Sequence, residues 1–216
     1  MTPNVELEQH RAFAGVIDVL EAIGADYVIW GGVAAVAYGE QRFTHDMDVV
    51  IKLNADDAHF MAKALEDGYH VSLPSMLDAL RGGFFNVIHL ETNVKVDFFV
   101  PGPDSILHWA FKHRRKLPFD EIRQASFMPP ESVILTKLRA YRGSGSNRHL
   151  DDIEGILRIS GPGLDLAYIC DSSLGFAEGF PLPSSRSGRG ERSNFPWRQR
   201  PNSTINSWIR SNPARR

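Results

Sequence analysis

Apolar residues recur along this chain with two different spacings, which predict an alternation of helices and strands. Helical spacing over residues 7–23 predicts a first helix, which Gly24 is expected to end. Residues 27–30 and 48–53 are short apolar runs typical of buried strands, and an Ala- and Val-rich helix is expected between them at 32–38. This alternation favours an α+β fold.

The alternation continues over the next hundred residues. Asn54 is placed to cap a helix at 55–65, because its side chain can accept from the first backbone N–H groups. Residues 84–90 and 94–100 flank a polar turn and predict a β-hairpin. The remaining expected elements are helices at 73–80, 104–111, 131–141 and 148–159, with short strands or loops at 115–128.

The composition changes at about residue 171. Residues 171–216 hold eight Arg, no Lys and three acidic residues, a net charge of +5, and the total of −2 therefore leaves −7 for residues 1–170. Such a tail, rich in Ser and Pro, buries too little apolar surface to offset its ordering entropy. We expect it to be disordered or atypical, with an RNA-binding tail as the alternative. The predicted domains are 1–128, a helical region at 129–170, and this tail.

The amino-acid composition of the whole chain indicates the cellular compartment in which the protein is expected. The composition, 43% hydrophobic and 23% charged, is ordinary for a globular protein. A single cysteine, Cys170, allows no disulfide within the chain, which favours the cytoplasm. The N-terminal residues do not resemble a signal peptide, and no apolar stretch approaches the length of ~20 residues that a membrane span needs. No membrane partner is therefore expected. The acidic body offers no basic patch for nucleic acid.

The chemically most informative stretch joins a glycine turn to a pair of carboxylates. Gly31 and Gly32 follow the first apolar strand, and Asp46 and Asp48 lie two residues apart within the second. Residues two apart in a strand point to the same face, so the two carboxylates are expected side by side. Like charges this close favour a bound cation, and oxygen ligands suit Mg²⁺.

This spacing resembles the signature of the polymerase-beta-like nucleotidyltransferase superfamily: an apolar residue, two small residues, about a dozen residues, then Asp-apolar-Asp. Here those positions are Trp30, Gly31, Gly32, Asp46 and Asp48. The resemblance implies a mixed β-sheet flanked by helices, with residues 1–128 as the catalytic domain and further C-terminal helices. It also implies a third carboxylate on a neighbouring strand. Asp97, in the apolar run 94–100, is placed for that role.

The resemblance implies a role for each of these residues. Asp46, Asp48 and Asp97 would be the catalytic residues and the ligands of Mg²⁺ in a two-metal site, with Asp97 taking the proton of the acceptor. Gly31 and Gly32 would let the backbone approach the triphosphate of ATP or another NTP. Three further nucleotide-binding candidates are Arg42, Lys137 and Asp152. For Lys137 and Asp152 the alternatives are a solvated helix lysine and a helix-capping surface charge.

A narrower resemblance, to bacterial nucleotidyltransferases related to the AbiEii toxins, rests on Gly31-Gly32, on 42–46 and on 130–138. It implies transfer of NMP from an NTP to an acceptor such as tRNA, a protein or a small hydroxyl compound. It also implies a toxin–antitoxin setting with a cognate protein partner. Two alternatives remain: a catalytically silent, antitoxin-like binding module of the same fold, and a metal-dependent phosphodiesterase, which the missing His–Asp metal cluster disfavours.

Overall fold

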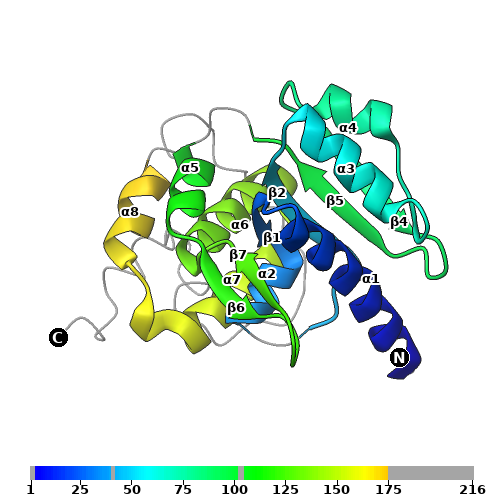
Figure 1. Ribbon diagram of the computed structural model, residues 1–216. Helices are drawn as coiled ribbons and strands as arrows, with labels where there is room; N and C mark the ends of the chain where they lie inside the picture. Colours follow the sequence, from blue (N-terminus) through cyan, green and yellow to red (C-terminus); the bar gives the residue numbers. More distant parts are fainter. Residues whose placement is uncertain (1–2, 40–41, 102–104, 175–216) are drawn as a thin grey trace. The chain divides into compact units, whose positions relative to one another are not determined.

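A seven-stranded mixed β-sheet organises the chain (Figure 1). The computed structural model describes residues 3–39, 42–101 and 105–174. The chain divides into two compact units, and the boundary between them in the sequence falls between Ser160 and Gly161. The strand order is β3-β4-β5-β2-β1-β7-β6. The strands are β1 Asp26–Trp30, β2 Met47–Lys52, β3 Tyr69–His70, β4 Phe84–His89, β5 Lys95–Phe99, β6 Arg115–Pro118 and β7 Gln124–Phe127.

The centre of the sheet is formed by β1, β2 and β5. Strand β2 pairs antiparallel with β1 and parallel with β5, while β4 and β5 form the predicted antiparallel hairpin. The register places Trp30 opposite Asp48 and Asp48 opposite Asp97. Residues far apart in sequence are therefore neighbours in the middle of the sheet.

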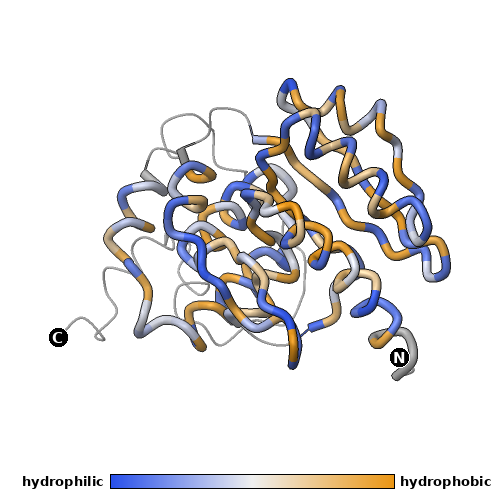
Figure 2. The backbone as a smooth tube through the Cα atoms, viewed as in Figure 1, coloured by the Kyte–Doolittle hydropathy of each residue, from blue (hydrophilic) through white to orange (hydrophobic). Residues whose placement is uncertain are grey.

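The helices of the larger unit form two groups around this sheet. Helix α1 contacts α3, which contacts α4, while α2, α6 and α7 pack on one another and α2 also contacts β1 and β2. Figure 2 shows hydrophobic and hydrophilic positions alternating along the turns of α1 and α3, as expected for amphipathic helices, whereas α2 consists of apolar and small residues. They are α1 Pro3–Ala22, α2 Gly31–Tyr38, α3 Ala55–Leu65, α4 Leu73–Ala79, α5 Ser105–Lys112, α6 Pro130–Ser144 and α7 Asn147–Ser160.

Local capping chemistry sets the predicted ends of several helices. The Asn54 side chain accepts from the Asp57 N–H at 2.9 Å, and Asp57 accepts in return from the Asn54 N–H, which completes a capping box at the start of α3. After α1, Gly24 adopts a left-handed conformation with φ of +61°. The predicted α+β alternation is confirmed, with most boundaries within two residues of expectation.

Two features differ from the sequence-based expectations. The two-residue edge strand β3 was not predicted, because a pair of residues carries no periodic signal. Helix α8, Leu166–Leu174, follows the 3₁₀ turn Gly161–Gly163 and extends past the expected start of the tail at 171. The expected Asp104 cap and residues 175–216 lie outside the described residues. Among the described helices, none is both long and apolar enough to cross a membrane.

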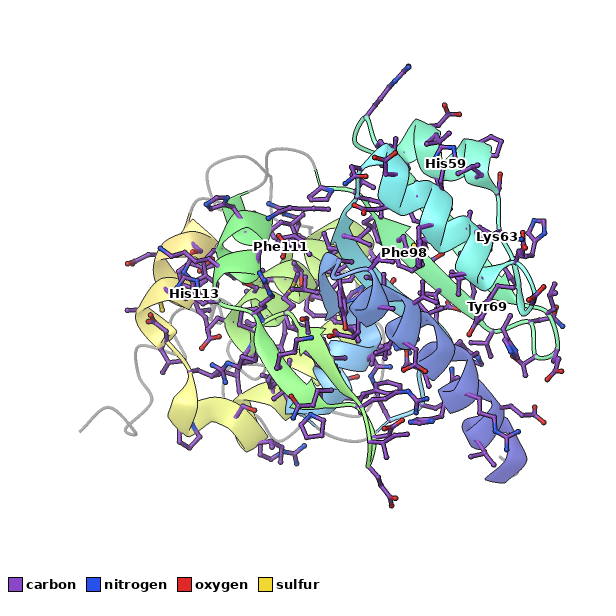
Figure 3. All side chains as sticks on the ribbon, in the orientation of Figure 1. His59, Lys63, Tyr69, Phe98, Phe111 and His113 are labelled. Carbon is purple, nitrogen blue, oxygen red and sulfur yellow. The ribbon has the colours of Figure 1, made fainter. Side chains whose placement is uncertain are left out.

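One face of the central strands is fully buried. Met47, Val49 and Ile51 of β2 are 0% exposed, and so is Phe98 of β5, which is labelled in Figure 3. The ring of Phe98 stacks on Phe85 of β4 at 4.8 Å between centroids. Since side chains alternate along a strand, Asp48 and Asp97 point to the other face. Packing of the apolar face therefore determines where the carboxylates project.

The stacked position of Phe98 makes its removal costly. Phe98→Ala should lower the free energy of unfolding by about 3–5 kcal/mol, because it leaves a cavity in a packed interior. Phe60→Ala on α3 is the matched control, since Phe60 is 56% exposed and should cost well under 1 kcal/mol. Urea unfolding followed by tryptophan fluorescence measures both, and equal losses would contradict this account of the core.

Candidate active site

Two of the predicted catalytic carboxylates, Asp48 and Asp97, are neighbours on β2 and β5, and the third, Asp46, lies just before β2. Asp48 lies within β2, directly opposite Asp97 of β5 in the parallel register. Asp46 precedes β2 rather than lying within it, because the strand begins at Met47. The expectation that both members of the pair project from one strand is therefore wrong for Asp46. Its charge nevertheless acts on Asp48, whose pKa it helps to raise.

The two glycines allow close approaches at the start of α2. Gly31 has φ of +64°, and a Cβ there would overlap the Asp48 carboxylate. A Cβ on Gly32 would lie 2.5 Å from Thr44 Oγ1, in the segment that leads to Asp46. The Gly32 N–H donates to the Asp48 carboxylate. The turn thus brings backbone donors of α2 against a carboxylate of the sheet.

Burial and like charge act together on Asp48. Burial of its side chain and the neighbouring Asp97 carboxylate, with a smaller effect of Asp46, raise the pKa of Asp48 to about 6. The Gly32 N–H and the positive charge of Lys137 oppose this rise in the pKa. The ionised form of Asp48 is therefore unfavourable in the folded chain, and a nearby cation would stabilise it.

Lys95 supplies positive charge at Asp97. It lies two residues before Asp97 on β5, and its Nζ is 2.7 Å from Asp97 Oδ2. The hydrogen bond to Asp97 raises the pKa of Lys95 against the opposing effect of burial, and the charges of Asp97, Asp46 and Asp48 add to the rise. Lys95 was not predicted as a site residue from the sequence, although its position two residues before Asp97 on an expected strand was a usable signal.

The three other nucleotide-binding candidates form a second charged cluster. Arg42 donates two hydrogen bonds to Asp152, Nε to Oδ1 at 2.5 Å and Nη2 to Oδ2 at 2.8 Å, and Lys137 Nζ lies 2.7 Å from the same Oδ2. Asp152 is 7% exposed. Burial would raise the pKa of Asp152, but the hydrogen bonds from Arg42 and Lys137 hold it below its ordinary value. The alternative of a capping or surface role for Asp152 is wrong, because its carboxylate is buried and paired.

The charged clusters are linked through Lys137 and the segment before β2. Lys137 of α6 is 8% exposed, so it is not a solvated lysine, and its charge acts on Asp48 and on the nearby His149. Gln9 of α1 donates to the backbone oxygens of Thr44 and His45 at 2.6 and 2.8 Å, which holds the segment leading to Asp46. Nothing in the local pattern around Gln9 predicts this contact.

The donor chemistry of the site suits a divalent cation. Asp97 is 9% exposed, and its Oδ1 is buried and finds no hydrogen-bond partner within the described part of the chain. An unpartnered buried carboxylate oxygen is costly, and hard oxygen donors are those that Mg²⁺ prefers. No group of three His, Cys, Asp or Glu side chains in the described residues is already placed to hold a metal. The residues fit Mg²⁺ in donor type, with Lys95 now balancing Asp97.

A cavity of about 550 Å³ lies elsewhere in the larger unit, beside α3 and β3. His59, Lys63 and Tyr69 are among its lining residues and are labelled in Figure 3. Its lining includes none of the predicted site residues. Because the carboxylates and the basic cluster lie outside this hollow, the chemistry of the side chains, rather than the cavity, locates the candidate site.

The chain was compared with known proteins. No family model matches the sequence, and no curated protein matches it significantly. Among solved structures, the antibiotic-resistance factor ANT(2'')-Ia aligns at 10% identity over 79% of this chain and 92% of that chain, with a TM-score of 0.52. JHP933 from Helicobacter pylori aligns at 13% identity over 82% of this chain and 76% of that chain, with a TM-score of 0.51.

A third solved structure, the lincosamide antibiotic adenylyltransferase LnuA bound to lincomycin, aligns at 14% identity over 72% of this chain and 98% of that chain, with a TM-score of 0.43. The structural neighbours thus include an antibiotic-resistance factor and a lincosamide antibiotic adenylyltransferase. At these identities the similarity shows the fold alone. The predicted fold class, a mixed sheet flanked by helices of the nucleotidyltransferase type, is confirmed.

The close approach of Gly31 to Asp48 can be separated from its backbone conformation. Gly24→Ala should cost about 1–2 kcal/mol of unfolding free energy, because its φ of +61° strains any side chain although no atom lies within 4 Å of the added Cβ. Gly31→Ala carries the same strain and also displaces the Asp48 carboxylate, so it should cost more. Urea unfolding of both variants measures the difference, and equal losses would show that the carboxylate moves aside freely.

The raised pKa of Asp48 predicts a stability that depends on pH. The folded state holds this proton more tightly than the unfolded chain, whose carboxyl pKa is about 3.9, so wild type loses stability as pH rises from about 4 through about 6. Asp48→Asn removes this loss, so in EDTA at pH 7.5 the variant should be about 1–3 kcal/mol more stable than wild type.

The gain from Asp48→Asn should shrink at pH 4.5, where wild-type Asp48 is largely protonated in the folded state. Urea unfolding at the two pH values gives the comparison. A variant that is less stable than wild type at pH 7.5 would show that the ionised carboxylate stabilises the fold without a metal.

Proposed function

We propose that this chain is a Mg²⁺-dependent nucleotidyltransferase that transfers NMP from an NTP to a hydroxyl acceptor. The observation that carries the proposal is the juxtaposition of Asp48 and Asp97 on neighbouring strands, beside the Gly31 turn. The raised pKa of Asp48 and the unpartnered oxygen of Asp97 both support a cation between them. The nucleotidyltransferase-type fold is consistent with this chemistry.

Asp46, Asp48 and Asp97 would hold the metal. When bound, Mg²⁺ supplies charge neutralisation for the attacking and leaving oxygens of an in-line displacement at phosphorus. Asp97 accepts the proton of the acceptor hydroxyl, since its carboxylate faces the same side of the sheet as Asp48. Asp48 also accepts from the Gly32 N–H, which keeps its carboxylate oriented towards the start of α2.

The anionic end of the nucleotide would lie near α2 and the basic cluster. The N-terminus of α2 offers backbone N–H groups and the positive end of a helix dipole. Arg42, Lys137 and Asp152 together carry a net charge of +1, so the two cations are only half neutralised by their shared partner. A triphosphate would therefore meet preorganised positive charge there, with Asp152 positioning the two basic side chains.

The acceptor is proposed as an RNA, a protein or a small molecule with a free hydroxyl group. The AbiEii-like motifs Gly31-Gly32, 42–46 and 130–138 support a toxin–antitoxin role with a cognate protein, in the cytoplasm where NTPs are available. Two structural neighbours are an antibiotic-resistance factor and an antibiotic adenylyltransferase, which supports including small hydroxyl compounds among the acceptors to be tested.

A second candidate is a catalytically silent binding module with the same fold. The observation that favours it is the Lys95–Asp97 ion pair, which balances one carboxylate without any metal. In that case the carboxylate face would serve a protein partner rather than a nucleotide. Nucleotide binding that depends on Mg²⁺ distinguishes the two candidates.

Calorimetric titration of each NTP, with and without Mg²⁺, tests the proposal. Wild type should bind at least one NTP only with Mg²⁺ present. Asp48→Asn with Asp97→Asn should weaken that binding by about tenfold or more, because two metal ligands lose their charge. Asp67→Asn is the matched control, since Asp67 is an exposed carboxylate in the turn after α3, and its affinity should equal that of wild type.

The nucleotide that binds can then be supplied with a labelled α-phosphate to search for the acceptor among cellular RNA, proteins and hydroxyl compounds. Transfer of label by wild type, lost in the double variant, supports catalysis. Folded wild type that binds no NTP in Mg²⁺ would contradict the enzyme and favour the binding module.

A further inference from the structure

We infer that Lys95 is a built-in counter-cation of the carboxylate cluster, which competes with the divalent metal for Asp97 and must leave that carboxylate when the metal binds. The inference rests on the proposed function, because it concerns the same metal site. It assigns to Lys95 a positioning role that is separate from catalysis: setting the affinity of the carboxylate cluster for the metal.

The contact is built into the sheet. Lys95 and Asp97 lie two residues apart on β5, so their side chains share the face that also carries Asp48. The Lys95 ammonium is 2.7 Å from Asp97 Oδ2, and the side chains of Lys95 and Asp97 are 36% and 13% exposed. The other Asp97 oxygen is buried and unpartnered within the described residues. Lys95 thus pairs with one oxygen of a carboxylate whose other oxygen has no hydrogen-bond partner among the described residues.

The charges explain why this contact opposes metal binding. Asp46, Asp48 and Asp97 carry −3 when ionised, and Lys95 reduces the local charge to −2. A divalent ion next to the ammonium would gain less from these carboxylates, because like charges a few ångströms apart repel each other. The solvent-exposed part of the flexible Lys95 stem gives the ammonium room to leave.

The neighbouring cation cannot replace Lys95 in this role. Lys137 acts on Asp48 through space, but its ammonium is held 2.7 Å from Asp152 on α7. Lys95 therefore provides the ion pair with Asp97. Without Lys95, Asp97 would be a nearly buried carboxylate with no paired cation, which destabilises the metal-free fold and strengthens its attraction for a metal.

Binding of Mn²⁺, as a probe for Mg²⁺, to the metal-free full-length protein tests the inference. The free Mn²⁺ signal in electron paramagnetic resonance gives the dissociation constant directly, without any turnover. Lys95→Met should bind Mn²⁺ about tenfold or more tightly than wild type. Lys95→Arg, which retains the charge, should stay within about threefold of wild type.

Lys52→Met is the matched control. Lys52 pairs with Asp26 at 2.7 Å across β2 and β1, the same distance as in the Lys95–Asp97 pair, but at the far end of β2 from Asp48. Its Mn²⁺ affinity should equal that of wild type. Lys95→Gln provides a second uncharged variant if Lys95→Met does not fold, and it should also bind Mn²⁺ more tightly than wild type.

Thermal unfolding gives an independent readout. In EDTA the uncharged Lys95 variants should melt below wild type, and saturating Mn²⁺ should raise their melting temperature by more than it raises that of wild type. Equal or weaker Mn²⁺ binding by these variants would overturn the role of Lys95 and leave the proposed function standing. Absence of Mn²⁺ binding from folded wild type and variants alike would overturn the metal site, and the inference with it.

Discussion

The structure depends on placing buried like charges next to each other at the centre of a sheet. Asp48 and Asp97 are brought side by side by the parallel register of β2 and β5, and the apolar residues on the opposite face of both strands hold that register. Slipping either strand by one residue would turn its carboxylate into the core, so the apolar packing also enforces the repulsion. The repulsion between the two carboxylates is partly offset by the Gly32 N–H and Lys137 at Asp48 and by Lys95 at Asp97. Packing energy in the core thus maintains an arrangement that its own electrostatics disfavour, a pattern typical of functional sites.

The two glycines of the turn connect this arrangement to the helices. Gly31 is required by its left-handed conformation and by the closeness of the Asp48 carboxylate, and Gly32 by the closeness of Thr44. Both requirements come from contacts within the protein, so a glycine pair expected to admit a triphosphate also has a structural purpose. The start of α2 therefore faces the carboxylates with its N–H groups, close to where Arg42 and Lys137 meet on Asp152. Negative and positive clusters lie next to each other, as a site for a metal-bound polyphosphate requires.

Much of this architecture was predictable because its causes are local. Apolar spacing indicated the helix after residue 7, the hairpin of β4 and β5 and the central strands, and the side-chain chemistry of Asn54 located the start of α3. The resemblance to the nucleotidyltransferase superfamily also implied that Asp97 lies on a strand neighbouring that of Asp48, and the register of β2 and β5 confirms this. Two errors have physical explanations. Asp46 falls outside β2 because β1 ends at Trp30, opposite Asp48, and the chain then turns into α2, which leaves no β1 residue to pair with Asp46. The strand β3 is too short to show a period.

By itself, the sequence determined the succession of elements, the apolar faces and the residue types available for chemistry, since these follow from short-range periodicity and from the side chains. Only the tertiary structure decided how the charges are paired. Asp152 is 110 residues from Arg42, yet both Arg42 and Lys137 bind it, and Lys95 rather than a more distant cation balances Asp97. Such pairings depend on the packing of α2, α6 and α7 and on strand order, which no local pattern encodes. The protonation preference of each carboxyl group is likewise set by the tertiary structure. Burial and the neighbouring Asp97 raise the pKa of Asp48, whereas the hydrogen bonds from Arg42 and Lys137 lower the pKa of Asp152 against the effect of burial.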